Sequence, residues 1–273
     1  MKKIIDSRIL IVGLVKDAAN TISAEVLKID KAFKEFKNLQ WLLIESDSKD
    51  PTAAELNRIS LDFPNFDFIT LGNLSKSLPK RTERLAYCRN QYLKEIRENP
   101  RYSEVDYVAV MDLDGINGLL TAAAVKSCWD RDDWDVCTAN QLGPYYDIWA
   151  LRHQAWSPND CWDQCRFLEY FGVPHEQAKL AAVYAKQIVI PPACGWIEVD
   201  SAFGGLAIYK RSALNEGQYF GVGDAGEEVC DHPFLHKTIR SNGGRIFINP
   251  QLINTDFTEH TLRFKKTPKL LYL

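Results

Sequence analysis

Short apolar runs alternate along the first half of the chain with longer segments whose apolar residues recur every three or four positions. This alternation is typical of βαβ units built around a mainly parallel sheet. It predicts strands at residues 8–15, 39–44, 66–71, 107–111 and 134–139. It predicts helices at 20–36, 52–61, 81–98 and 119–128. The pattern therefore favours an α/β fold with a Rossmann-like sheet flanked by helices.

The sequence pattern changes after residue 140, where prolines interrupt the chain. Four tryptophans lie within residues 149–196, both ends included. We expect loops over most of this region. We also expect these loops to pack against the sheet and to form a surface that faces a ligand. A strand pair is predicted within 199–210, a helix at 231–241 and a closing strand at 245–249. The chain has no internal repeat, low-complexity tract or linker, so the pattern predicts one domain over residues 1–273.

Composition and charge argue against two classes of protein, nucleic-acid binders and membrane-spanning proteins. Hydrophobic residues make up 46% of the 273, which is ample for a core, and the formal net charge is −3. No global positive field exists to hold nucleic acid, so a generic DNA or RNA binder is disfavoured. The longest apolar stretch near the N-terminus, 9–15, is far shorter than the roughly 20 residues of a membrane span, so we expect no transmembrane segment.

The seven cysteines are odd in number and show no disulfide framework. We therefore expect reduced thiols and a cytoplasmic protein. Cys161 and Cys165, with His153 and His175 nearby, suggest a zinc site. The spacing lacks the usual close cysteine pair followed by a second pair, so buried thiols are the favoured interpretation.

Polar side chains follow the predicted strands at the edge where parallel sheets bind ligands. The second strand runs into a stretch of short oxygen-bearing side chains over 45–52. A helix-capping turn would explain residues 48–52 as well as a nucleoside-binding site would. The capping turn explains the presence of Glu45 less well. Glu45 and Ser46 are therefore candidate ligand contacts.

The fourth strand runs directly into Asp112, Leu113, Asp114 and Gly115. Residues two apart on an extended chain point the same way, so the two carboxylates converge, and Gly115 lets the backbone turn away. Placing two like charges together is costly unless a cation compensates them. We expect that cation to be Mg²⁺ or Mn²⁺, shared with a diphosphate.

The start of the third helix is rich in positive charge and includes Arg84 and Arg89. A helix N-terminus with added guanidinium groups suits a diphosphate, although a solvated basic face is the competing interpretation. Aromatic and polar residues alternate in a further candidate loop, which suits either a sugar-facing surface or core packing. Its members are Tyr145, Asp147, Trp149 and Arg152.

Two more segments carry candidate chemistry in the second half. Ser201, Gly204 and Gly205 lie in a stretch whose glycines let backbone approach a ligand. Carboxylates at Glu227, Glu228 and Asp231 precede the 231–241 helix, where they either complement its dipole or accept a proton from an attacking hydroxyl. His260 is either an exposed polar residue or a late metal ligand.

The order of these motifs resembles that of the GT-A nucleotide-sugar glycosyltransferases. The motifs occupy residues 13–16, 45–52, 81–90, 112–114, 201–205 and 227–231, followed by His260. More narrowly, 84–90 and 145–152 look like the capsule-associated mannosyltransferases of the Cap59 type. The resemblance spans roughly residues 8 to 260, and its strength lies in the shared order of short motifs.

The resemblance implies a metal-dependent transfer of sugar from a nucleoside-diphosphate sugar to a hydroxyl of a glycan or glycoconjugate acceptor. Residues 1–140 would form the nucleotide-sugar-binding half and 141–273 the acceptor-binding half. Asp112, Asp114 and His260 would hold Mn²⁺ or Mg²⁺. The donor would contact Gly13, Leu14, Val15, Lys16, Glu45, Ser46, Arg84, Arg89, Asp112, Leu113, Ser201, Gly204 and Gly205.

Asp231 falls near the position where many inverting members of that family carry the catalytic base. Its preceding residue is Cys230, where the family has an acid, so Glu227 and Glu228 compete for the role. Two other functions stay open. A sugar-phosphate nucleotidyltransferase usually has a Gly-rich basic loop after its first strand, and 12–17 has one glycine. A non-catalytic carbohydrate-binding protein would have no need of both Asp112 and Asp114.

Overall fold

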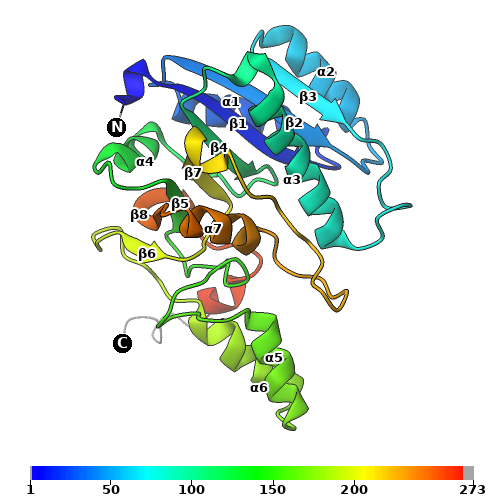
Figure 1. The fold of residues 1–273 in the computed structure, drawn as a ribbon, viewed down its shortest axis with the longest axis vertical. Helices are drawn as coiled ribbons and strands as arrows, with labels where there is room; N and C mark the ends of the chain where they lie inside the picture. Colours follow the sequence, from blue (N-terminus) through cyan, green and yellow to red (C-terminus); the bar gives the residue numbers. More distant parts are fainter. Residues whose placement is uncertain (1, 267–273) are drawn as a thin grey trace.

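The computed structural model describes residues 2–266, and its centre is one eight-stranded mixed sheet (Figure 1). The strand order across the sheet is β3-β2-β1-β4-β7-β5-β8-β6. The strands are β1 (Arg8–Val15), β2 (Asn38–Glu45), β3 (Phe66–Thr70), β4 (Tyr107–Asp112), β5 (Val136–Gln141), β6 (Ile197–Val199), β7 (Leu206–Lys210) and β8 (Ile246–Thr255).

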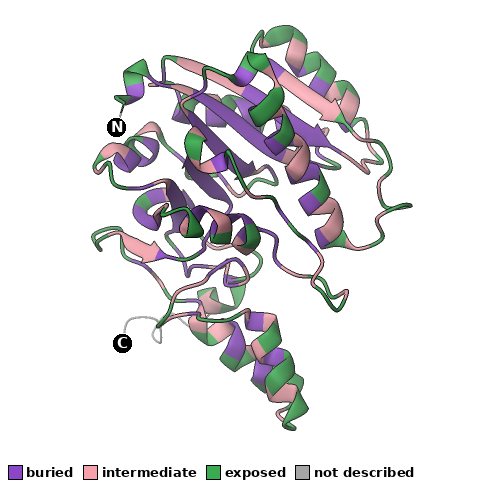
Figure 2. Ribbon diagram, in the orientation of Figure 1, coloured by how far each residue is buried: buried purple, intermediate pink, exposed green. Residues whose placement is uncertain are grey.

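Helices cover both faces of this sheet, as the alternating pattern predicts. They are α1 (Ile22–Ala32), α2 (Thr52–Asp62), α3 (Arg81–Glu98), α4 (Ala122–Lys126), α5 (Cys161–Tyr170), α6 (His175–Ala182) and α7 (His232–Ser241). Successive residues of β1 face opposite sides. Leu10 and Val12 pack in one core cluster with α3 and α7, whereas Ile9 and Ile11 pack in a second with α1, α2 and α4. Figure 2 shows the strands buried between these layers.

The parallel part of the sheet brings the carboxyl ends of β1, β2 and β4 side by side. In the register, Val15 pairs with Glu45, and Leu14 pairs with Asp112. The predicted strand at 8–15 and helix at 81–98 match the structure at both ends. The antiparallel strand β7 lies between β4 and β5, so the sheet is mainly rather than wholly parallel. The predicted fold class is confirmed.

The predicted strand pair within 199–210 is wrong, because β6 and β7 are not neighbours. β7 pairs with β4 and β5, and β6 pairs with β8. Gly204 and Gly205, with φ of 69° and 81°, turn the chain between the two strands instead of forming a hairpin.

The expectation of loops over most of 140–198 is also wrong in part, because α5 and α6 form a helical hairpin there. Asp160 caps α5 by accepting from the backbone N–H groups of Trp162 and Asp163, and Pro174 stands immediately before α6. The proline at that position marks a helix start rather than a loop. Figure 1 shows the hairpin projecting from the body of the protein. Within residues 2–266, no helix combines the length and apolar character needed to cross a bilayer.

Candidate functional site

A cavity of about 580 Å³ opens at the carboxyl ends of β1, β2 and β4. Residues that end or follow these strands line one side: Leu14, Val15, Lys16, Asp17, Ala18, Thr21, Ser46, Asp47, Asp112, Leu113 and Asp114. The start of α3 contributes Arg81, Thr82, Arg84, Leu85, Cys88 and Arg89. The second half of the chain contributes Tyr146, Asp147, Trp149, Phe203, Cys230, Asp231 and His232. We call this space the strand-end cavity.

Ten of the eighteen residues to which the sequence analysis gives donor, metal or catalytic roles line the strand-end cavity: Leu14, Val15, Lys16, Ser46, Arg84, Arg89, Asp112, Leu113, Asp114 and Asp231. Eight others do not: Gly13, Glu45, Ser201, Gly204, Gly205, Glu227, Glu228 and His260. The structure therefore brings ten of these eighteen residues around one cavity at the strand ends and leaves the other eight outside it.

Local structural roles account for several of the residues outside the cavity. A Cβ on Gly13 would lie 2.7 Å from the Met111 carbonyl oxygen, so this glycine lets β1 pack closely against β4. Glu45 is buried and accepts from the backbone N–H of Ser48 at 3.2 Å. The buried hydroxyl of Ser201 lies 2.8 Å from Nδ1 of His236.

Glu228 acts as a cap for a helix distant in sequence. Its Oε1 accepts from the backbone N–H and the hydroxyl of Thr82, at 3.0 and 3.1 Å, at the first turn of α3. Glu227 is exposed, and its backbone carbonyl accepts from the N–H of Gly223. His260 is exposed and stacks on the ring of Tyr146, with centroids 5.8 Å apart. Of the three predicted catalytic acids, Asp231 alone lines the cavity.

Arg89 stands at the centre of the charged groups in the cavity. Its Nη1 donates to Oδ2 of Asp231 at 2.6 Å, and its Nη2 lies 3.6 Å from Oδ1 of Asp112. The side chain is 8% exposed, and its Cζ lies over the rings of Phe203 and Tyr219, 5.9 and 5.7 Å from their centroids. The guanidinium thus ties α3 to the end of β4 and the start of α7.

The carboxylates near Arg89 carry more negative charge than the single positive charge of its guanidinium can balance. Removal from bulk water raises the pKa of Asp112 to about 7, with further upward contributions from Asp114, Asp147 and Asp231. Enclosure also raises the pKa of Asp147, which accepts from the backbone N–H of Gly204 at 3.0 Å. Arg89 lowers the pKa of Asp112 but does not offset the combined effect. This excess of carboxylate oxygens fits a hard divalent cation.

Hydrogen bonds involving two side chains, Glu25 and Asn117, hold the turn after β4 in place. Gly115 has a φ of 88°, and its N–H donates to Oε2 of Glu25 at 3.0 Å. Asn117 donates through Nδ2 to the backbone carbonyl of Asp112 at 2.7 Å. Burial raises the pKa of Glu25, and the neighbouring Asp114 raises it further. These contacts fix where Asp112 and Asp114 leave the strand.

The predicted metal ligands are gathered only in part. Asp112 and Asp114 both line the strand-end cavity, and His260 does not. In the described chain, no three ligand atoms from His, Cys, Asp or Glu at this cavity lie within 4.8 Å of one another. The carboxylate pair is the part of the predicted set that the fold brings to the cavity.

Sequence reasoning missed His232 in this cavity. The imidazole is buried, stacks on Phe203 with centroids 4.0 Å apart, and has no hydrogen-bond partner at either ring nitrogen among residues 2–266. Burial and the nearby Arg89 lower its pKa well below the usual range, so the ring is neutral. Its position directly after Asp231 was the available signal. Asp47, which belongs to the 45–52 stretch but was not assigned to the donor, also lines the cavity and lies 3.8 Å from Nε of Arg84.

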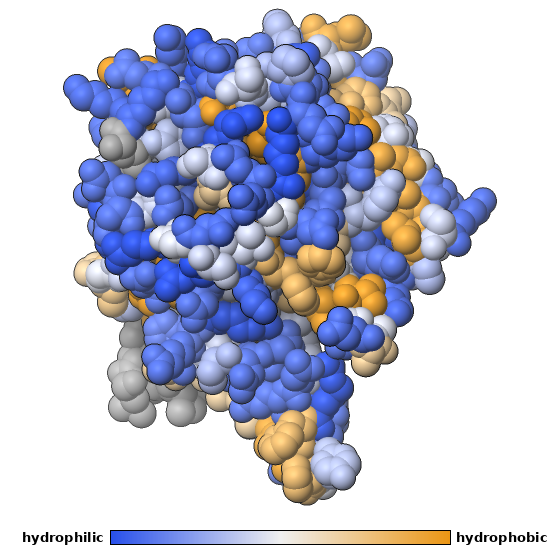
Figure 3. Space-filling view, in the orientation of Figure 1, coloured by the Kyte–Doolittle hydropathy of each residue, from blue (hydrophilic) through white to orange (hydrophobic). Residues whose placement is uncertain are grey.

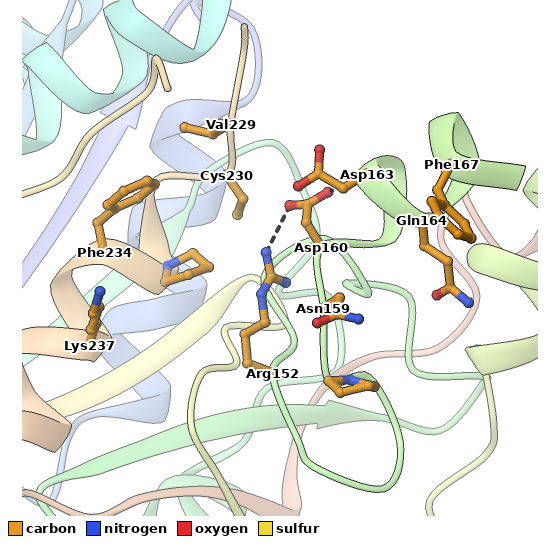
Figure 4. A pocket seen from close by; sticks show the side chains of 12 residues that line it. Arg152, Asn159, Asp160, Asp163, Gln164, Phe167, Val229, Cys230, Phe234 and Lys237 are labelled. Atoms are coloured by element: carbon orange, nitrogen blue, oxygen red, sulfur yellow. Dashed lines mark hydrogen bonds and ion pairs between the residues drawn. The ribbon is translucent and has the colours of Figure 1, made fainter. Parts of the chain in front are cut away.

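A second cavity of about 810 Å³ adjoins the first, and Cys230 lines both. Figure 4 shows one wall formed by α7 and another formed by α5 and the loop before it, with Arg152 between them. Nη2 of Arg152 donates to Asp160 at 2.8 Å. The lining comprises Arg152, Pro158, Asn159, Asp160, Asp163, Gln164, Phe167, Val229, Cys230, Pro233, Phe234 and Lys237. We call this space the hairpin cavity.

Comparison with known proteins bears on the fold. No protein-family model matches the sequence, and no curated protein sequence is similar enough to match. Among solved structures, S. aureus TarS 1-349 in complex with UDP-GlcNAc is 12% identical with a TM-score of 0.50, over 92% of this chain and 59% of that chain. The mannosyltransferase PcManGT from Pyrobaculum calidifontis, in complex with GDP-Man and Mn²⁺, is 17% identical with a TM-score of 0.48, over 92% and 56%.

This chain therefore spans less than two thirds of the length of either structure. At these identities the comparison bears on architecture alone. The mixed sheet, with helices on both faces and its cavity at the strand ends, is a GT-A fold.

The raised pKa of Asp112 predicts a pH-dependent gain in stability for Asp112→Asn. The ionised carboxylate is less favourable in the folded chain than in the unfolded chain, so its cost is absent below the ordinary pKa of 3.8 and grows as pH rises toward about 7. Urea unfolding in EDTA should show the variant's advantage growing over that range and levelling above it. Asp224→Asn, at an exposed loop aspartate, is the matched control. An advantage that is equal at every pH would contradict the enclosed charge.

Proposed function

We propose that this chain is a metal-dependent glycosyltransferase that moves a sugar from a nucleoside-diphosphate sugar to a hydroxyl of a glycan acceptor. The observation that carries the proposal is the strand-end cavity, which an acidic pair and several basic side chains line together. Such an arrangement suits a diphosphate held together with its counter-cation. The neighbour of the same fold, TarS, was solved with UDP-GlcNAc, which supports a nucleotide sugar as the ligand class.

Asp112 and Asp114 are the residues that would hold Mn²⁺ or Mg²⁺. Both offer carboxylate oxygens, the ligand type these cations prefer. When bound, the cation would neutralise charge that develops on the diphosphate leaving group. Lys16, Arg81 and Arg84 line the same cavity and would hold the phosphate oxygens by charge-assisted hydrogen bonds. Arg89 would act chiefly by holding Asp112 and Asp231, because its guanidinium is already paired with both.

Asp231 is the group best suited to accept the proton of the attacking hydroxyl. It lies at the N-cap of α7, and its Oδ2 accepts from Arg89. Within the described residues, no hydrogen bond from another side chain occupies Oδ1. In the proposed step the acceptor oxygen bonds to the anomeric carbon and the bond from that carbon to the phosphate oxygen breaks. The nucleoside diphosphate leaves, and the hydroxyl proton passes to Asp231.

The hairpin cavity is the proposed acceptor site. All of its lining residues come from the second half of the chain, and it meets the strand-end cavity at Cys230, the residue before Asp231. Phe234 is 37% exposed, and its ring offers an apolar face to the C–H groups of a sugar. Asn159 and Lys237 have no side-chain hydrogen-bond or ion-pair partner in the described part of the chain, so both are available to sugar hydroxyls. This combination of an aromatic face and a few polar groups is typical of small-ligand sites.

Replacing the proposed base should separate donor binding from chemistry. Asp231→Asn should bind GDP and UDP within a few-fold of the parent, because an amide oxygen can still accept from Arg89. Its rate should fall by roughly 100- to 10,000-fold, because the proton acceptor is gone. The rate is measured as nucleoside-diphosphate release from GDP-mannose and UDP-N-acetylglucosamine, supplied with Mn²⁺, and circular dichroism checks the fold.

Glu228→Gln is the matched control for that variant, since Glu228 caps α3 and does not line the cavity. It keeps an amide oxygen that can accept from Thr82, so it should stay folded with little change in stability and keep its rate within a few-fold. The assignment fails if Asp231→Asn keeps the parent rate while Glu228→Gln loses it.

Phe234→Ala should weaken the acceptor site without altering the donor site. With any oligosaccharide that accelerates nucleotide release by the parent, the acceptor KM should rise about 2- to 12-fold, which is the range expected for loss of one ring contact worth roughly 0.5–1.5 kcal/mol. Donor hydrolysis in the absence of acceptor should be unchanged. Phe220 packs against Phe234 at a tilted angle, with ring centroids 5.5 Å apart, but does not line the hairpin cavity, so Phe220→Ala is the control. A rise of equal size in both variants would contradict the proposed site.

A further inference from the structure

We propose that the α5–α6 hairpin binds a zinc-class transition-metal ion through Cys165, Glu169 and His175. Each of these residues offers one ligand atom, and the three atoms lie within 4.8 Å of one another. It is the one such group that residues 2–266 contain. The three residues line neither cavity, so this site is separate from the proposed transferase chemistry.

The local sequence brings the three ligands together. Cys165 and Glu169 are four residues apart on α5 and therefore lie on one face of that helix. His175 is the first residue of α6. The turn between the helices is tight, because Gly172 has a φ of 86° and the N–H of Val173 donates to the carbonyl of Leu168 at 3.1 Å. This helix-ending motif fixes where α6 begins relative to the last turn of α5.

Packing between the two helices holds the thiol in place. The buried side chains of the hairpin are small: Cys161 and Cys165 on α5, and Ala178 and Ala182 on α6. Sγ of Cys165 lies 4.0 Å from Oε1 of Glu169. Small side chains let the helices approach closely, so Cys165 is positioned by the interface rather than by a flexible loop.

The outer side of the cluster is open. The side chains of Glu169 and His175 are 35% and 60% exposed, and Nδ1 of His175 contacts the Glu169 carboxylate. An ion here would have the protein on one side and solvent on the other, so water would complete a four-coordinate site. Tetrahedral zinc places its ligand atoms about 3.5 Å apart, and the three atoms here lie within 4.8 Å of one another.

The chemistry of the three ligand atoms determines which class of metal ion the hairpin site would bind. Thiolate and imidazole favour Zn²⁺ and its spectroscopic substitute Co²⁺, whereas Mg²⁺ and Mn²⁺ favour oxygen ligands. The strand-end cavity offers carboxylates, so the two sites would take different cations. Burial raises the pKa of the Cys165 thiol, so metal binding must displace its proton.

A metal ion at this position would link α5 to α6 near the free end of the hairpin. Figure 3 shows apolar side chains at the free tip of the projecting hairpin, and Phe167 and Phe171 are 62% and 69% exposed. Because the helices project, each has mainly the other for support. A bond across the turn would restrain fraying there and leave the core unchanged.

The test is titration of EDTA-treated full-length protein with Co²⁺ alone, in a Cys194→Ser background that removes the exposed thiol. We expect thiolate-to-cobalt charge-transfer absorption that saturates with one Co²⁺ bound at the hairpin, and bleaching of that absorption by Zn²⁺. Co²⁺ bound by the carboxylates of the strand-end cavity gives no thiolate band. Cys165→Ser should abolish the absorption. Loss of an outer-shell partner costs about 10- to 100-fold in metal affinity, so His175→Ala should weaken Co²⁺ binding at least that much.

Cys161→Ser and His153→Ala are the matched controls. Cys161 lies one turn earlier on α5, and His153 is a second histidine near the hairpin; neither belongs to the cluster. Both variants should keep the parent absorption. The proposal is overturned if the parent shows no thiolate band at excess Co²⁺, or if the band survives Cys165→Ser. It is also overturned if His175→Ala binds Co²⁺ as tightly as the parent, since the histidine then only pairs with Glu169.

Discussion

The buried guanidinium of Arg89 is the interaction on which the strand-end cavity depends. It donates to Asp231 at 2.6 Å and lies 3.6 Å from Asp112, so one side chain of α3 fixes the end of β4 and the start of α7. Breaking a buried pair of this kind by removing one partner costs about 3–5 kcal/mol, because the other charge is left uncompensated. The position of both acids is therefore coupled to the packing of α3.

The same cluster explains why a divalent cation belongs to the proposed chemistry. Arg89 supplies one positive charge, whereas Asp112, Asp114, Asp147 and Asp231 all contribute to the local field. Hydrogen bonds to Glu25 and from Asn117 hold the turn after β4, so the acidic pair leaves the strand at a fixed position. Such an excess of negative charge is what the proposed binding of a cation and a diphosphate would require.

Much of the architecture and the location of the site could be predicted from the sequence. The switch between apolar runs and helical periods specifies the βαβ units, and the carboxyl ends of the parallel strands then locate the cavity with Asp112 and Asp114 at its edge. The hairpin α5–α6 was missed because its short helices follow prolines and tryptophans, which also mark loops. Glu228 was assigned to chemistry because its cap on Thr82 joins positions 146 residues apart, a contact that spacing cannot indicate.

The central claim is that the acidic pair binds a divalent cation together with a nucleoside diphosphate. Isothermal titration of EDTA-treated protein with GDP and with UDP, each with and without Mn²⁺, tests this most directly. The account predicts that Mn²⁺ strengthens binding of one of these nucleotides at least tenfold, and that a variant carrying both Asp112→Asn and Asp114→Asn loses this enhancement while remaining folded. Equal binding of both nucleotides with and without Mn²⁺, or a full enhancement in the double variant, would contradict it.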